Sequence, residues 1–599
     1  MEYLIVFIIT FINSASISIK MNRKIEEVLP IVVVGIILVI YILGLFNNLA
    51  LGVNIVELIT TISLIHIIMQ IKNKKQKIIR NIITPGIVIY LMYIMINIIL
   101  NKGRILEKYD SFNHWALITK NMYLYNGYGM MEKSIVNFNE YPPFTAIFQY
   151  LFLKIKGEYA EDTIIIAQNI LYFSMIMPLF RNIDWQGKIK NLNLIIPTVI
   201  FIPMIFYKDF YTEILVDGFI GILFALGLYT IYKKENDQRY RYIMIGSYSI
   251  ALALIKNTGI VFASIILIVE TISLLKEKDK LRGILIISIL GLLIIGSWWA
   301  KILINKGNLN WKDKESIYIK EGQEESRNEV IHHFANEIIE PTRPITVRNL
   351  SLLMCFTIYI TYSIFLYKKI KAYRLKSILI TMIMTTVLYV MNMLVVYLTL
   401  FEQEETQILS SFNRYASTML LSGFFLNTII LCDIIEFKTY YLSLIVTLLL
   451  FFLPIEDISS MYIHAREYNV AVMARRNEYG KIKKYKNLFN ETDKIYLVTD
   501  RLSDYKFAMA ISKYELMPIL IGNDDGTDFN KNLKDELMDN YTYIYILKEN
   551  NQFNKIFEST FGEKIEFESD SLYKINKKND NIEVEKILLN DIFELMVFE

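Results

Sequence analysis

A polar cluster interrupts a strongly apolar part of the chain. Asp110-Ser-Phe-Asn-His114-Trp places a carboxylate and an imidazole four residues apart, and a Tyr141-Pro-Pro turn follows further along. A helix after Tyr109 would put Asp110 and His114 on one face, since residues i and i+4 are neighbours on a helix. A membrane protein that only anchors or scaffolds has little reason to carry such a cluster, which therefore predicts a functional site.

Further charged groups stand at the ends of apolar runs. Asp217, Lys256 and Arg414, the last with Tyr415 beside it, each lie at such an end. An ionised side chain at the membrane centre costs about 2.5–3.5 kcal/mol on insertion scales, so such residues usually serve a site or a partner. Acids together with a lysine and an arginine on one face predict a pocket for a phosphorylated lipid and a hydroxyl acceptor.

The composition requires a membrane to surround most of the chain. Of its 599 residues, 54% are hydrophobic, and the mean hydropathy is +0.36. Apolar runs of roughly 18–25 residues recur from Leu4 to about Pro454, and each is long enough to cross a hydrocarbon core of about 30 Å. These runs predict a polytopic α-helical membrane protein. The net charge of +3 is too small to indicate a nucleic-acid partner.

Basic clusters set the expected orientation, because they remain on the cytoplasmic side. Placing all of them inside predicts about thirteen to fourteen transmembrane helices, with both termini outside. The richness in Ile, Lys and Asn suggests an AT-rich bacterial genome, so the expected location is a bacterial cytoplasmic membrane. The clusters lie near residues 20–24, 72–80, 181–190, 233–241, 276–282 and 368–376. The predicted spans are 2–19, 28–46, 50–71, 81–100, 161–180, 192–207, 212–232, 241–256, 258–275, 283–300, 348–367, 377–400, 414–432 and 438–455.

The same orientation predicts the external segments. It places loops 101–160, 301–347 and 401–412 outside, and only one crossing fits between the first of these loops and the next basic cluster. Phe144–Ile155 is therefore expected to be a short interfacial helix rather than a span. All the polar groups described above then fall on the outer face.

After Pro454 the pattern becomes that of a soluble α/β domain. Lys494–Asp500 is a predicted strand, Asp504–Leu516 an amphipathic helix, and Met517–Gly522 and Tyr541–Leu547 are further strands. The expected organisation is N-terminal transmembrane helices in 1–80, a transmembrane catalytic module in 81–455 with external loops 101–160 and 301–347, and an extracytoplasmic α/β domain in 456–599.

The polar motifs resemble those of a known class of membrane enzyme. The Asp110–Trp115 stretch with Tyr141-Pro-Pro resembles the first external loop of bacterial relatives of the protein O-mannosyltransferases and aminoarabinose transferases, which are glycosyltransferases of the GT-C fold. Val216–Gly218, Leu254–Gly259 and Phe412–Tyr415 resemble recurring elements of that branch, and the resemblance covers about residues 80–430.

One position departs from the pattern of these relatives. Many of them carry a second acid directly after the loop aspartate, and this chain has Ser111 there. The sequence therefore gives no support for a mechanism or a metal site that needs two adjacent acids.

The resemblance implies an integral membrane glycosyltransferase that moves a sugar, with inversion, from a polyprenyl-phosphate-linked donor to a hydroxyl-bearing acceptor on the outer face. Asp110 would be the general base, a role worth about 10²–10⁴-fold in rate. His114 would orient Asp110 or contact the donor phosphate, and Lys256 and Arg414 would hold the leaving phosphate. Tyr141, Asp217 and Tyr415 complete the expected substrate-binding set. The acceptor belongs to the cell envelope, and its identity stays open.

Structural alternatives exist for the loop residues. Asp110 could cap a helix that starts at Ser111, because Asp is a preferred N-cap residue. His114 beside Trp115 could belong to the aromatic belt at the membrane interface. The Tyr141-Pro-Pro sequence is a turn, whatever else it does.

The charged residues at the span ends have structural alternatives as well. Asp217 could pair with Lys208 or Lys256. Lys256 could instead extend its ammonium to the lipid headgroups as an ordinary anchor. Arg414 could bind headgroups without taking part in catalysis.

Three other functions stay open at this stage. A transporter or flippase for a lipid-linked saccharide would need charges near the bilayer midplane and discontinuous helices. A polysaccharide polymerase or ligase is chemically close to a transferase, and a non-catalytic descendant would keep the fold alone. The sequence has no Walker motif and no Cys/His cluster with zinc-ligand spacing, so it predicts no cofactor and gives no support for a divalent metal.

Overall fold

The computed structural model forms two compact units. The membrane unit comprises Met1–Arg104, Tyr125–Met130 and Phe138–His464, and the C-terminal unit comprises Ile105–Leu124, Met131–Asn137 and Ala465–Glu599. The C-terminal unit thus includes residues 105–124, which the sequence analysis assigned to an external loop of the transmembrane module. The structure describes residues 2–130, 134–136, 138–185, 192–233, 237–274, 280–305, 324–340, 350–370, 373–401, 403–434, 447–500, 505–522, 533–562, 564–578 and 581–588.

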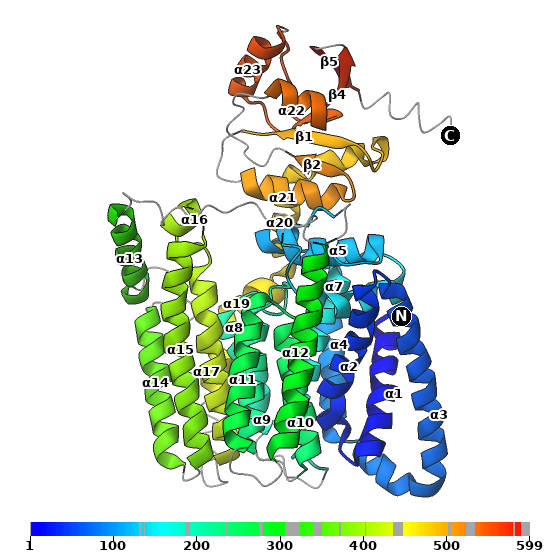
Figure 1. The fold of residues 1–599 in the computed structure, drawn as a ribbon, viewed down its shortest axis with the longest axis vertical. Helices are drawn as coiled ribbons and strands as arrows, with labels where there is room; N and C mark the ends of the chain where they lie inside the picture. Colours follow the sequence, from blue (N-terminus) through cyan, green and yellow to red (C-terminus); the bar gives the residue numbers. More distant parts are fainter. Residues whose placement is uncertain are drawn as a thin grey trace. The chain divides into compact units, whose positions relative to one another are not determined.

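The membrane unit is a bundle of apolar helices (Figure 1). Within the described residues, seven helices are long and apolar enough to cross a membrane, and three shorter apolar helices accompany them. The chain is therefore a polytopic α-helical membrane protein, as predicted. The helices are α1 (Glu2–Met21), α2 (Ile25–Leu45), α3 (Leu49–Ile82), α4 (Pro85–Asn101), α6 (Phe144–Lys156), α7 (Glu161–Ile176), η2 (Met177–Phe180), α8 (Leu192–Phe206), α9 (Asp217–Lys233), α10 (Gln238–Ala253), α11 (Asn257–Leu274), α12 (Lys280–Ile304), α13 (Glu324–Ile339), α14 (Leu352–Lys369), α15 (Tyr373–Thr399), α16 (Gln403–Gln407), α17 (Phe412–Ile434), α19 (Ile455–Ile458) and η6 (Ser459–Ile463).

Most predicted spans coincide with one of these helices. The largest shift at the start of a span is in α9, which begins at Asp217 instead of residue 212, because turns occupy residues 208–213. At the other end of a span, α3 continues to Ile82, beyond the predicted end at residue 71. Most of the loop 301–347 and the first half of the span 438–455 lie outside the described residues. The total of thirteen to fourteen spans stays a prediction.

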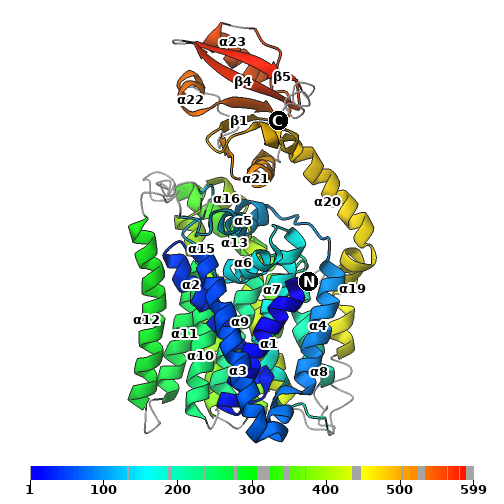
Figure 2. The same cartoon turned by 90° about the vertical axis from the view of Figure 1, so that its right-hand side faces the viewer.

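Helix α6 has the bounds expected of the interfacial helix, but its setting is different. Every residue from Phe144 to Leu153 is buried, so α6 does not lie on a surface. The reason is its neighbours: α6 packs against α7, α1 and α2, and α1 and α2 pack beside α3 (Figure 2).

Three of the six basic segments predicted on the cytoplasmic side meet at one end of the bundle. The ammonium of Lys24 donates hydrogen bonds to the carbonyl oxygens of Arg181 and Ile183, at 2.6 and 2.9 Å. Arg23 forms an ion pair with Asp237 at 3.5 Å. Residues far apart in the sequence thus come together here, as the alternation of the spans requires. Which side of the membrane this end faces stays a prediction.

Helices α9 and α17 run parallel and are joined by an ion pair at each end. Asp217 and Arg414 pair near their first residues at 3.3 Å, and Lys233 and Asp433 pair near their last residues at 2.7 Å. Between these pairs the helices approach closely at Gly221, where a Cβ atom would lie 2.5 Å from the carbonyl oxygen of Thr418.

The C-terminal unit contains a five-stranded sheet in the order β2-β1-β3-β4-β5. Strands β1, β2 and β3 are parallel, whereas β4 and β5 form an antiparallel hairpin at one edge. The elements are η1 (Ser111–Trp115), α5 (Ala116–Tyr125), α20 (Ala465–Tyr479), η7 (Lys481–Leu488), β1 (Lys494–Val498), α21 (Tyr505–Leu516), β2 (Leu520–Gly522), α22 (Leu533–Asn540), β3 (Tyr543–Ile546), α23 (Asn551–Phe561), β4 (Ser571–Lys578) and β5 (Asn581–Ile587).

The predicted α/β pattern is confirmed in its first half. The strand at 494, the helix that follows it and the strand near 543 are present, and the strand predicted at 517–522 is shorter, since it begins at Leu520. The hairpin of β4 and β5 was not predicted, because lysine and asparagine dilute the apolar alternation of these strands.

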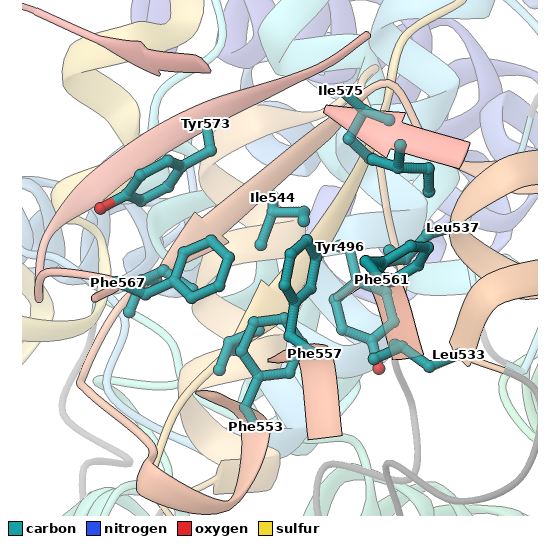
Figure 3. Close-up of a cluster of buried hydrophobic side chains, with 13 residues drawn as sticks. Tyr496, Leu533, Leu537, Ile544, Phe553, Phe557, Phe561, Phe567, Tyr573 and Ile575 are labelled. Atoms are coloured by element: carbon teal, nitrogen blue, oxygen red, sulfur yellow. The ribbon is translucent and has the colours of Figure 1, made fainter. Parts of the chain in front are cut away.

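Aromatic side chains fill the core of this sheet (Figure 3). Phe553, Phe557 and Phe561 recur every four residues along α23, so they form one apolar helix face. This face packs with Tyr496 and Ile544 of the central strands, which are fully or almost fully buried.

The close approach of α9 to α17 gives a first prediction. Gly221→Ala should destabilise the protein by about 1–3 kcal/mol, because the new methyl group overlaps a backbone carbonyl that cannot move aside. Gly246→Ala on α10 is the matched control, since a Cβ atom there meets nothing within 4 Å. Denaturant unfolding in detergent measures both variants. Equal stability of the two would contradict the described packing.

Candidate functional site

Three charged side chains from distant parts of the sequence meet in the membrane unit. The ammonium of Lys256 donates a hydrogen bond of 2.9 Å to Oδ1 of Asp217, and Nε of Arg414 lies 3.3 Å from Oδ2 of the same carboxylate. The side chains of Asp217 and Lys256 are 6% and 9% exposed, and that of Arg414 is 20% exposed. We refer to Asp217, Lys256 and Arg414 as the charged triad.

The triad lies where several helices begin. Asp217 is the first residue of α9, Lys256 directly precedes α11, and Arg414 is near the start of α17. The N-terminus of a helix carries a positive partial charge and unpaired N–H groups, so it favours a negative ligand. Three helix N-termini together with a lysine and an arginine make this end of the bundle electropositive.

The turn that carries Lys256 is fixed from two sides. The backbone N–H of Phe144, at the start of α6, donates a hydrogen bond of 2.7 Å to the carbonyl oxygen of Leu254. A Cβ atom at Gly259 would lie 2.0 Å from the carbonyl oxygen of Leu252, so only glycine allows α10 and α11 to approach this closely. The close packing of α11 against α10 therefore explains why a glycine stands at position 259.

Two tyrosines border the cations of the triad. The ammonium of Lys256 lies 5.2 Å from the ring centre of Tyr415 and 6.0 Å from that of Tyr141, and the guanidinium of Arg414 lies 5.3 Å from the ring of Tyr415. These distances permit cation–π attraction. Burial raises the pKa of Tyr141 to about 12, although the charge of Lys256 acts to lower it. The Tyr141 hydroxyl thus stays protonated at neutral pH and can donate a hydrogen bond.

The triad has one more positive charge than negative charge. Asp217 allows two cations to lie close together in a poorly hydrated place, because it attracts both of them. A phosphate group carries the negative charge that both cations attract. The arrangement is thus suited to binding a phosphorylated ligand.

Residues that the sequence analysis did not single out hold the triad in place. The Tyr207 hydroxyl donates to the carbonyl oxygen of Arg414 at 2.6 Å. The side-chain amides of Gln168 and Asn169 on α7 donate to the carbonyl oxygens of Leu215 and Tyr211, at 3.1 and 2.8 Å. The Gln168-Asn169 pair of amides in an otherwise apolar span was a signal that could have found them.

Asp110 and His114 belong to the C-terminal unit. The helix predicted after Tyr109 is present, with a π-helical turn at Ser111–Trp115. Such turns occur frequently at functional sites. Asp110 is the N-cap residue of this turn, yet its side chain makes no capping hydrogen bond, so the capping alternative is not supported. His114 is buried, and its ring meets that of Trp115 edge-on, with the two ring centres 4.6 Å apart.

The structure thus brings together five of the seven predicted site residues. These five are Tyr141, Asp217, Lys256, Arg414 and Tyr415, and their roles stay predictions. Among the residues that the structure describes, no group of three or more His, Cys, Asp or Glu side chains could hold a metal ion.

Comparisons with known proteins give a distant likeness. No family model matches the sequence, and no curated protein matches it. The solved structures include a similar chain, the crystal structure of ArnT from Cupriavidus metallidurans bound to undecaprenyl phosphate. The sequences are 10% identical, the match covers 84% of this chain and 97% of that chain, and the TM-score is 0.36.

The shared carboxylate of the triad gives a second prediction. Asp217→Asn should lower the free energy of unfolding by about 3–5 kcal/mol, because it removes the negative charge that two neighbouring cations share. Adding Lys256→Gln should restore part of the loss, since only one cation then remains. Denaturant unfolding in detergent measures the single and double variants.

Asp433→Asn is the matched control for this experiment. It removes the carboxylate of the second ion pair between α9 and α17, which the ammonium of Lys233 approaches to 2.7 Å. Its loss of stability should be smaller than that of Asp217→Asn. If adding Lys256→Gln deepens the loss caused by Asp217→Asn, the role of Asp217 as a shared counter-ion is wrong.

Proposed function

We propose that this protein is an integral membrane glycosyltransferase of the GT-C type. It moves a sugar from a polyprenyl-phosphate-linked donor to a hydroxyl-bearing acceptor of the bacterial cell envelope, on the outer face of the cytoplasmic membrane. The observation that carries the proposal is the charged triad, in which two cations meet where three helices begin, an arrangement suited to binding phosphate.

In the proposed reaction the acceptor oxygen forms a bond to the anomeric carbon, and the bond from that carbon to the phosphate oxygen breaks, with inversion. Negative charge grows on the leaving phosphate. Arg414 offers a planar fork of donors for phosphate oxygens, and Lys256 acts as a compact positive charge. Both act from a poorly hydrated place, where such stabilisation is strongest.

The proposed general base is Asp110, which takes the proton from the acceptor hydroxyl. Asp110 is partly exposed, so a hydroxyl group can reach it. His114 lies four residues further along the same helical segment and would orient Asp110 or contact the donor.

The position of the triad disfavours the transporter alternative. Asp217 and Arg414 pair near the first residues of α9 and α17, and a separate ion pair lies near their last residues. A carrier would instead need its charges near the bilayer midplane, at broken helices. A polymerase or ligase would use the same phosphate chemistry with a longer saccharide, so the assay below includes such donors.

The proposed phosphate site gives a third prediction. Purified wild-type protein should transfer radiolabelled sugar from a panel of polyprenyl-phosphate and polyprenyl-diphosphate donors to cell-envelope acceptors. Lys256→Gln should lower kcat by about 10²–10³-fold, the usual effect of removing one group that stabilises transition-state charge. Lys233→Gln is the control, since Lys233 pairs with Asp433 at the other end of α9. Equal loss in both variants would contradict a specific role for Lys256.

The proposed base gives a fourth prediction, measured in the same assay. Asp110→Asn should lower kcat by about 10²–10⁴-fold and leave donor binding unchanged, because the amide cannot accept the acceptor proton. Asp110→Glu should keep part of the activity, since it retains a carboxylate. A fully active Asp110→Asn enzyme would show that Asp110 is not the base.

A further inference from the structure

The segment that carries Asp110 and His114 packs with the C-terminal part of the chain. Residues 105–124 fall in the C-terminal unit, although they continue directly into the membrane unit at Arg104 and Tyr125. The π-helical turn η1 lies against α21, which in turn packs against α20. Residues separated by almost 400 positions in the sequence therefore share one compact unit.

Phe112 is the centre of this packing. Its side chain is fully buried and makes edge-on ring contacts with Tyr514 and Phe507, with ring centres 5.3 and 5.9 Å away. The guanidinium of Arg476 lies 5.1 Å from the Phe112 ring, within cation–π distance. Phe112 lies between Asp110 and His114 in the same helical segment, so its contacts fix the positions of both neighbours.

Polar contacts hold the segment on either side of Phe112. Before it, the Tyr468 hydroxyl on α20 donates a hydrogen bond to the Glu107 carboxylate. After it, the ammonium of Lys120 donates a hydrogen bond of 2.5 Å to the carbonyl oxygen of Tyr514 and lies 4.6 Å from the Tyr514 ring. Glu107, Phe112 and Lys120 thus make these contacts before, between and after Asp110 and His114 along the chain.

Charge pairs strengthen the surface on which the segment packs. Arg476 on α20 pairs with Glu515 on α21, and Lys483 pairs with the same carboxylate at 3.3 Å. Burial acts to raise the pKa of Glu515, but the positive charges of Arg476 and Lys483 outweigh it and hold that pKa below its ordinary value. Glu515 is therefore charged at neutral pH and fixes Arg476 beside Phe112.

We propose that the C-terminal unit is part of the catalytic apparatus, because Tyr514 and Arg476 act as positioning residues that hold the Asp110–His114 turn through Phe112. The inference rests on the proposed function and adds a role for the C-terminal unit within it. Catalysis depends steeply on such positioning, since misplacing a reacting group by about 1 Å can cost roughly 10²-fold in rate.

A unit that positions the base and a unit that selects the acceptor predict different effects on the kinetics of sugar transfer. A domain that only selects the acceptor would change KM for the acceptor when it is altered and would leave kcat unchanged. A unit that positions the base would change kcat and leave donor binding unchanged.

The test uses the full-length protein with two variants of Tyr514 and one control. Tyr514→Ala removes the ring that contacts both Phe112 and Lys120, whereas Tyr514→Phe keeps that ring. Phe557→Leu is the control, because Phe557 lies in the buried core between the sheet and α23. This substitution perturbs the same unit at a different place. Hydrogen–deuterium exchange of residues 105–124 and the kinetics of sugar transfer are measured for each protein.

In Tyr514→Ala, exchange in residues 105–124 should rise and kcat should fall by about 10–10²-fold, with donor binding unchanged. Tyr514→Phe and Phe557→Leu should stay close to wild type in both measurements. Unchanged exchange in Tyr514→Ala, or faster exchange with an unchanged kcat, would overturn the inference while the proposed transferase stands. If wild type transfers no sugar from any donor, the proposed function fails, and the catalytic role of the C-terminal unit fails with it.

Discussion

The attraction of one carboxylate for two cations organises the membrane unit. Asp217 is buried, and so is Lys256, while Arg414 remains partly exposed. Without the carboxylate, an ammonium and a guanidinium would repel each other in a largely buried place, where water screens charges poorly. With it, three segments far apart in the sequence meet at the helix N-termini that a negative ligand favours. The same interaction thus serves folding and leaves the positive charge that the proposed phosphate site requires.

The rest of the bundle keeps that interaction in place. The second ion pair, between Lys233 and Asp433, fixes the register of α9 and α17 at their other ends, and Gly221 lets the two helices touch. The amides of Gln168 and Asn169 fix the turns that lead into α9. In the C-terminal unit, aromatic packing holds the Asp110–His114 turn in place. The charged triad and the Asp110–His114 turn therefore both depend on partners that are distant in sequence.

The sequence was most informative where local patterns decide the structure. The long apolar runs predicted the transmembrane helices, and the spacing of Asp110 and His114 predicted a helical turn. The pairing of Asp217 with Lys256 appeared among the alternatives, but the double pairing with Arg414 did not, because spacing along the chain carries no information on distances between helices. The burial of α6 and the packing of Phe112 against Tyr514 were missed for the same reason, since each depends on tertiary contacts.

The most direct test of the central claim is the affinity of the protein for a polyprenyl monophosphate, measured in lipid nanodiscs. We expect wild type and Lys233→Gln to bind it equally well, and Arg414→Gln to bind about 10–10²-fold more weakly, in line with the loss of a hydrogen bond to a charged group. Equal affinity in all three proteins would show that the charged triad does not bind the lipid phosphate, and the proposed site would be wrong.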